Sequence, residues 1–160
     1  VKHDQVVQKA VQAEVPTRRG KEVITDLVVS ALTDYLKASG RSEFASVSFF
    51  ERDGGTDLTY PACIIGEDGS PDENEIIRGQ WTVPIQVVVM TIPEDDESSS
   101  THRNICKAVN DLIGNDEAVI AALGNSVQCN DSNGGQGVTE AEDGFRQTTF
   151  TVEIKAAALS

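Results

Sequence analysis

The chain has 160 residues, of which 39% are hydrophobic. This size and composition suit one globular domain with a packed core and exclude a largely disordered chain. Thirteen Lys and Arg residues against 26 Asp and Glu residues leave a net charge of −13, which argues against broad contact with nucleic-acid phosphates and favours a soluble acidic protein.

Neither a membrane segment nor a secretory signal is evident. No apolar run approaches the length needed to cross a bilayer, and the first residues lack the charged and apolar regions of a signal peptide. Val1 is expected to follow a removed initiator Met. The three cysteines form no Cys-x-x-Cys pair, so we expect buried reduced thiols at Cys63, Cys106 and Cys129 and folding in a reducing compartment.

The first predicted element is a short helix over residues 4–15. Val7 and Val11 lie four residues apart in it, at helical spacing. We expect Pro16 to end this helix, because proline lacks the backbone donor that the helix interior needs. A helix this short is not stable alone, so residues 1–16 are predicted to be an arm that packs on something else, or a frayed terminus.

The remainder, residues 17–160, is predicted to be a single domain. It starts with a clearer amphipathic helix over residues 21–38, and Gly40 provides the usual stop signal. Two strands are predicted over residues 46–52 and 60–66. The short connections that join them to the next strand permit antiparallel pairing.

A long strand dominates the middle of the chain. It is predicted over residues 76–92, after a polar loop over residues 66–75. Pro84 within this strand cannot donate a ladder hydrogen bond, so we expect an edge position or a bulge there. Trp81 is expected in the core or at an interface.

A second amphipathic helix is predicted over residues 98–113, with the Ser and Thr residues at 98–101 available as caps. Asn115 is predicted to cap a shorter helix that runs through Leu123, and Gly124 to close it.

The C-terminal part reads as a short strand over residues 126–130, a mobile Gly- and Asp-rich tract over residues 131–144, and an alternating strand over residues 145–156. The element order predicts an α+β fold, namely a two-layer mixed or antiparallel sheet of about four or five strands packed on one face by two main helices.

Catalytic motifs are missing from the sequence. His3 lies in the predicted tail, and His102 in the first turn of a helix, where a solvated or capping role is favoured over a general base. No nucleophile, zinc-protease, phosphate-loop or dinucleotide motif is recognisable. The glycines at 134–137 lack the helix N-terminus that a phosphate cradle needs. We therefore expect a binding or structural protein rather than an enzyme, with no cofactor.

Two acidic clusters offer the oxygen ligands that Ca²⁺ prefers. They are Asp53 to Asp57 and Glu94 to Glu97. Neither has the ligand spacing of an EF-hand loop, so solvated turns are favoured over a metal site. A small module that binds Ca²⁺ or another ligand remains an alternative function.

Four segments then follow one another in a recognisable order. They are Tyr60-Pro61-Ala62-Cys63-Ile64-Ile65, Val83-x-Ile85-x-Val87-x-Val89, His102-x-x-Ile105-x-x-Ala108-Val109-x-x-Leu112 and Phe150-x-Val152-x-Ile154. Over about residues 20–155 this pattern resembles the tail terminator family of tailed bacteriophages and related head–tail joining proteins.

The resemblance implies a structural virion protein without enzymatic activity, assembled in the host cytoplasm. Members of that family form a ring, typically a hexamer, at the head-proximal end of the tail, which stops growth of the tail tube and joins tail to head. The implied partners are other copies of the chain, the tail tube protein and a head–tail connector or neck protein. A head-completion or connector protein one layer nearer the capsid is the neighbouring alternative.

A ring of such acidic subunits suggests roles for two groups of residues. An acidic channel lets DNA slide through without specific binding, and the candidate lining is Glu94, Asp95, Asp96 and Glu97. The ring also needs contacts between neighbouring copies, and the candidate contact residues are Val7, Val11 and Trp81.

Overall fold

The computed structural model describes the backbone of residues 2–52, 58–92, 96–142 and 144–159, and the side chains of residues 20–52, 58–92, 100–141 and 144–159. The helices are α1 (Lys2–Lys37), α2 (Asp96–Ile113), α3 (Asp116–Leu123) and the 3₁₀ turn η1 (Ser42–Phe44). The strands are β1 (Ser48–Glu51), β2 (Ala62–Glu67), β3 (Asp72–Glu73), β4 (Gln80–Thr91), β5 (Val127–Gly134), β6 (Val138–Glu142) and β7 (Phe145–Ala158).

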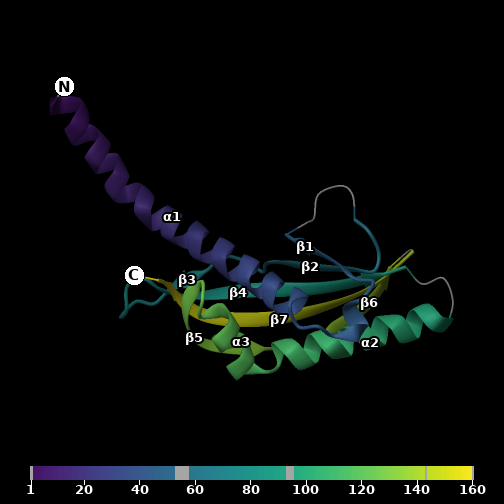
Figure 1. Cartoon of the computed structure of the whole chain (residues 1–160). Coiled ribbons are helices and arrows are strands. Elements are labelled where there is room, and N and C mark those ends of the chain that lie inside the picture. The colour runs from purple at the N-terminus through teal and green to yellow at the C-terminus, as the bar shows by residue number, and fades with distance from the viewer. Residues whose placement is uncertain (1, 53–57, 93–95, 143, 160) are drawn as a thin grey trace.

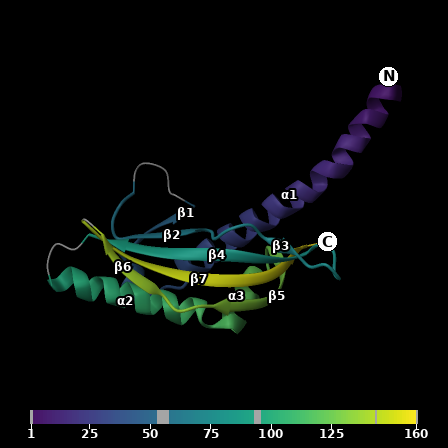
Figure 2. The same ribbon diagram turned by 180° about the vertical axis from the view of Figure 1, so that it is seen from behind.

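A mixed sheet carries the fold, and the predicted α+β class is confirmed. Its five main strands lie in the order β1-β2-β4-β7-β5, with β3 paired to β4 and β6 paired to β7. Three helices pack against this sheet (Figure 1). Seen from behind, the strands lie in front of the helices, so one face of the sheet carries no helix of the described residues (Figure 2).

The pairing of the first two strands differs from the prediction. β1 runs parallel to β2, with Ser48 opposite Ala62, whereas the β2–β4, β4–β7 and β5–β7 pairs are antiparallel. The connection over residues 52–61 replaces a tight hairpin turn, and its length lets the chain return to the end of the sheet at which β1 begins.

Helix α1 is one continuous helix of 36 residues, so the predicted stop at Pro16 is wrong. A proline inside a helix removes one hydrogen bond and crowds the preceding turn, but beyond its neighbours Val15 and Thr17 the runs Ala13-Glu14 and Arg18-Arg19 are good helix formers. The helix therefore continues from the predicted arm into the predicted second helix. Its C-terminal half packs on the sheet, and its N-terminal half extends away from it (Figure 1).

The core lies between the helices and the sheet. Every fourth residue of the packed half of α1 is fully buried, which is the spacing that keeps side chains on one helix face. Alternate residues of β4 meet them, because successive side chains of a strand point to opposite faces. These residues are Ile24, Val28, Leu32 and Leu36 on α1, and Val83, Ile85, Val87 and Val89 on β4.

The start of β4 lies four residues later than predicted, at Gln80. Ile76 and Ile77 are instead 93% and 56% exposed in the turn before it. The Asn74 side-chain oxygen accepts the backbone N–H groups of Ile76 and Ile77 at 2.8 and 3.0 Å. Such an Asx turn competes with strand hydrogen bonding, which explains why these two β-branched residues do not extend the strand.

Pro84 lies in the central strand β4 and not in an edge strand. On one side of β4, however, the pairing is interrupted at this residue. Pairing of β2 with β4 ends at Ile85, and pairing of β3 with β4 begins at Thr82. The Pro84 carbonyl accepts the N–H of Asp68 at 2.9 Å. Since the N and O atoms of one strand residue point to the same neighbour, the missing N–H of Pro84 faces this gap in the ladder.

The tract over residues 131–144 was predicted to be mobile, and the structure contradicts this. β5 extends to Gly134, and β6 follows it, and both pair with the 14-residue β7. Glycine lets the strand pass close to α2: a Cβ on Gly134 would lie 2.4 Å from the carbonyl oxygen of Ile113. These glycines therefore serve close packing.

Local signals placed the two later helices well. α2 begins at Asp96, two residues before the prediction, so residues 98–101 lie within the helix. The predicted cap of α3 is confirmed: Asn115 accepts the N–H of Ala118, and the N–H of Gly124 donates to the carbonyl of Ile120 at the other end.

Candidate functional site

Most of the predicted acidic channel loop lies outside the described residues. Glu94 and Asp95 are not described, and Asp96 and Glu97 are the first two residues of α2, described in backbone only. The acidic cluster at residues 53–57 is likewise outside the described part. The channel lining therefore stays a prediction.

The predicted contact residues fall in two places. Val7 and Val11 belong to the N-terminal half of α1, and their side chains are outside the described residues. Trp81 is only 9% exposed and belongs to the core cluster. A Cβ on Gly20 of α1 would lie 4.0 Å from its ring. Trp81 thus takes the core role, and little of its surface is left for a second subunit.

The structure corrects the expectation for His102. The ring is 2% exposed, so it is neither solvated nor a helix cap. Its Nδ1 lies 2.8 Å from the Thr91 hydroxyl on β4, and its Nε2 lies 2.8 Å from the Thr148 hydroxyl on β7. Thr139 on β6 lies 2.8 Å from Thr148 through their hydroxyls. His102 therefore joins α2 directly to β4 and β7, and Thr148 extends the network to β6.

The His102 contacts favour a neutral ring. A neutral imidazole has one donor and one acceptor nitrogen, which two hydroxyls can satisfy. Burial lowers the pKa of His102, and the positive charge of Arg146 lowers it further. Because no substrate can reach a ring this well buried, we assign it a structural role.

The cysteines are free thiols with little nucleophilic character. Cys63 is fully buried, as predicted, and burial raises its pKa to about 12. Cys106 and Cys129 are only half-buried, and burial raises their pKa values too. Since the thiolate is the reactive form, none of the three is set up as a nucleophile.

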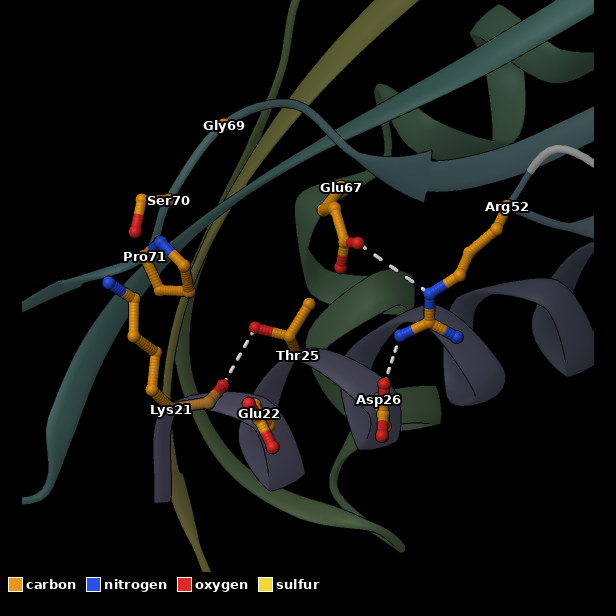
Figure 3. A pocket seen from close by; sticks show the side chains of 9 residues that line it. All are labelled: Lys21, Glu22, Thr25, Asp26, Arg52, Glu67, Gly69, Ser70 and Pro71. Carbon is orange, nitrogen blue, oxygen red and sulfur yellow. Dashed lines mark hydrogen bonds and ion pairs between the residues drawn. The ribbon is translucent and has the colours of Figure 1, made fainter. Parts of the chain in front are cut away.

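A cleft of about 650 Å³ opens between α1 and the ends of β1 and β2 (Figure 3). The Arg52 guanidinium crosses it, pairing with Asp26 of α1 and lying 3.6 Å from Glu67 of β2. The hydrogen bond to Asp26 raises the pKa of Arg52. These side chains are 42–60% exposed, and exposed pairs of this kind contribute about 0–1 kcal/mol each. The cleft thus holds a surface tie between sheet and helix.

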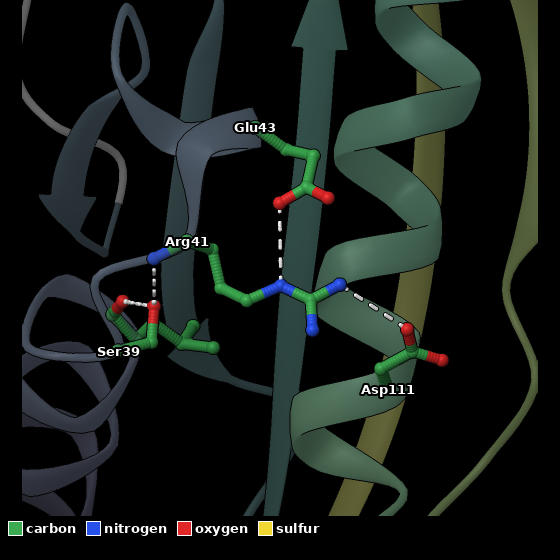
Figure 4. A network of polar contacts seen from close by, with 5 residues as sticks. Ser39, Arg41, Glu43 and Asp111 are labelled. Atoms are coloured by element: carbon green, nitrogen blue, oxygen red, sulfur yellow. Dashed lines mark hydrogen bonds and ion pairs between the residues drawn. The ribbon is translucent and has the colours of Figure 1, made fainter.

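A second polar cluster secures the loop after α1 (Figure 4). Arg41 lies 3.2 Å from Glu43 and 3.3 Å from Asp111 of α2. The Ser39 hydroxyl donates to the carbonyl of Leu36 and accepts the backbone N–H of Arg41. The cluster joins the end of α1 to α2, and all its charges are paired within it, so it has a structural role.

The face of the sheet without helices carries a row of apolar side chains. Phe50, Ile64, Val88 and Thr149 are successive register partners across β1, β2, β4 and β7, and Thr149 is paired with Val138 of β6. Their neighbours Cys63, Val87 and Val89 point into the core, so strand alternation puts this row on the opposite face. We call these five residues the cross-strand row.

Most of the cross-strand row is not freely exposed: Val88 in its middle is only 8% exposed, and Phe50, Ile64 and Thr149 are half-buried, which leaves two points open to contact. Val138 is 64% exposed at one end. A hollow of about 500 Å³ lies beside Ile64 and Val88, with Gly66 and Gln86 in its wall. A surface that is apolar, hollowed and free of helices has the properties of an interaction site.

Metal and membrane sites find no support in the described part of the chain. Within it, no three His, Cys, Asp or Glu side chains gather as metal ligands would. No helix there combines the length and the apolar composition that a bilayer crossing requires.

The chain matches no protein-family model and no curated protein.

Consecutive apolar residues in three strands already indicate the cross-strand row in the sequence. A strand with one solvent-exposed face alternates between apolar and polar residues. These strands instead contain the consecutive apolar residues Phe49-Phe50, Ile64-Ile65 and Val87-Val88-Val89. Runs of this kind indicate strands with apolar side chains on both faces. The sheet was expected to have helices on one face only, and the combination predicts apolar side chains on the other face as well.

Proposed function

We propose that this chain is a structural ring subunit of a bacteriophage tail, placed at the head-proximal end, where the ring ends tail-tube growth and joins tail to head. The resemblance of residues 20–155 to tail terminators motivates the identity. The proposed partners are other copies of the chain, the tail tube protein and a head–tail connector or neck protein.

One observation carries the proposal: the described part of the chain presents two different surfaces that lie away from its core. The N-terminal half of α1 extends away from the sheet, and the cross-strand row lies on the face without helices (Figures 1 and 2). Contact between two different patches on identical subunits is heterologous, and heterologous contacts generate rings when the rotation closes. A ring subunit needs two such surfaces.

The chemistry of the described residues is consistent with a structural role. The His102 ring is inaccessible, burial raises the pKa values of all three thiols, and the charged cleft at Arg52 is a set of ion pairs. An enzyme site would combine an accessible titratable group with a pocket. These observations support an assembly protein rather than an enzyme.

The first test is the oligomeric state of the purified full chain. We expect native mass spectrometry and negative-stain microscopy to show a closed ring, with six subunits as the family resemblance implies. Added to polymerising tail tube protein from the same phage, the ring is expected to bind tube ends and shorten the tubes.

The outcome also separates the neighbouring alternatives. A ring that binds the connector but leaves tube length unchanged would indicate a head-completion protein instead. A chain that remains monomeric at the highest concentration it tolerates would contradict both assembly roles. A rise in melting temperature with Ca²⁺ alone, without assembly, would support the ligand-binding module.

A further inference from the structure

The charges of the chain are divided unequally between the extended part of α1 and the rest. Residues 2–19 contain four basic side chains and two acidic ones, for a net charge of +2 in a chain of −13. We call residues 2–19 the arm. Residues 20–160, which we call the body, therefore carry −15. The arm and the body of the same chain have opposite charge.

The sheet face without helices is acidic around its apolar row. Register and alternation put Asp131, Glu140 and Glu153 on this face, because their partners Lys155, Gln147 and Pro84 alternate with core residues. All three carboxylates are exposed, and Lys155 is the basic residue among them. A basic helix with apolar residues one turn apart complements such a surface.

The arm cannot reach that face in its own chain. α1 packs on the helix-bearing side of the sheet, with Gly20 beside Trp81, and the arm continues away from there as one helix (Figure 1). To contact the opposite face of the same sheet, the helix would have to break and turn around the sheet edge. A second copy can meet it without any such change.

We propose that the arm of each copy docks on the cross-strand row of the next copy, with Val7 and Val11 against the row and the arm cations against the acidic side chains around it. This inference rests on the proposed self-assembly and names the two surfaces that carry it. The docked arm would cover the face that has no helix, and each subunit would then have helices on both faces of its sheet.

The receiving surface is tested by Val138→Asp in the full chain. Val138 is 64% exposed, so the folded monomer tolerates the change. We expect the dissociation constant between subunits to rise by about tenfold or more, since burial of a valine contributes strongly to an interface. Ile77→Asp is the matched control at a 56% exposed residue outside the proposed surface, and we expect it to change the constant by about twofold at most.

The arm is tested by reversing its four cations, Lys2, Lys9, Arg18 and Arg19, to Glu. The control reverses four exposed cations of the body, Lys37, Arg78, Arg103 and Lys107, and so changes the net charge by the same amount. We expect the arm variant to associate about tenfold or more weakly than the control. Adding Glu140→Lys and Glu153→Lys to the arm variant is expected to restore part of the loss.

The outcomes separate this inference from the proposed function. A wild-type chain that never assembles overturns both. A wild type that assembles, with the arm variant no weaker than its control or Val138→Asp no weaker than Ile77→Asp, overturns the arm-to-row contact and leaves self-assembly standing. Analytical ultracentrifugation provides the constants, and circular dichroism checks that each variant is folded.

Discussion

The ring of His102 holds α2 against the two central strands of the sheet. Threonine hydroxyls from β4 and β7 occupy both of its nitrogens at 2.8 Å. A protonated ring has two donors and no acceptor, and it would place a second positive charge near Arg146. Protonation of His102 at low pH therefore weakens this contact between α2 and the sheet.

We expect the free energy of unfolding to fall as the pH falls below about 6.5. His102 has a lowered pKa in the folded chain, so the unfolded chain takes up its proton first, and stability is lost as the pH drops towards the folded pKa. The nearby groups are Arg146 of β7, whose positive charge lowers the pKa of His102, and Cys106 of α2, whose pKa is raised by burial.

Urea unfolding from about pH 7.5 to about pH 5 measures this effect. His102→Asn serves as the comparison, because asparagine can bond hydroxyls and does not titrate in this range. Its stability is expected to decline less steeply with acid than that of the wild type. Parallel pH profiles for the two proteins would show that His102 is not responsible.

The role of His102 was within reach of the sequence. His102, Ile105 and Val109 are spaced three and seven residues apart, which puts them on one helix face. The expectation of a solvated residue came from starting the helix at residue 98, whereas α2 begins at Asp96. An error of two residues at a helix end, common in any assignment, changed the expected environment of the side chain.

At the scale of elements, features that depend on local sequence were predicted correctly, whereas strand pairing over long sequence distances was not. Asn115 and Gly124 bound α3 as predicted, because capping depends on residues within one turn. The parallel pairing of β1 with β2 and the strand character of residues 131–144 depend on partners far along the chain. No local composition specifies such partners, and the glycines of that tract favour a loop when read alone.

Gly134→Ala is expected to destabilise the chain by about 1–3 kcal/mol, because the new methyl group would meet the carbonyl oxygen of Ile113 at 2.4 Å. Backbone cannot move aside as a side chain can, so β5 would have to separate from the end of α2. Chemical unfolding gives the value, and an unchanged midpoint would contradict the close packing of strand and helix.

Gly20→Ala is expected to act in the opposite direction. Gly20 is inside α1, and a Cβ there meets only the Trp81 ring at an ordinary contact distance of 4.0 Å. Replacing a helical glycine by alanine typically stabilises by about 0.5–1 kcal/mol. A loss of stability in this variant would indicate that α1 does not run as one helix past Trp81.

The whole molecule is a body with one extended helix, whose first half the sequence predicted as a separate short helix or arm over residues 1–16. Amphipathic helices and alternating strands identified the α+β class because each element must bury one face. The continuity of α1 through Pro16 and the apolar face opposite the helices were missed. Neither feature is part of the main core, and the core-forming pattern of apolar residues therefore does not reveal it.

Hydrogen exchange is expected to distinguish the arm from the body. A helix without tertiary packing opens readily, so the amides of residues 2–19 are expected to exchange rapidly in the dilute monomer. In the assembled state we expect their exchange to slow by about tenfold or more, with α3 unchanged as the internal reference. Equal exchange in both states would show that assembly does not involve the arm.

The position of Trp81 has a practical consequence. It is the single tryptophan of the chain, and it lies beneath Gly20, where α1 leaves the sheet. Its fluorescence is therefore an intrinsic reporter for this junction. A shift in the emission wavelength or a change in quenching by iodide would report movement of α1 near Gly20 in real time, with no dye attached.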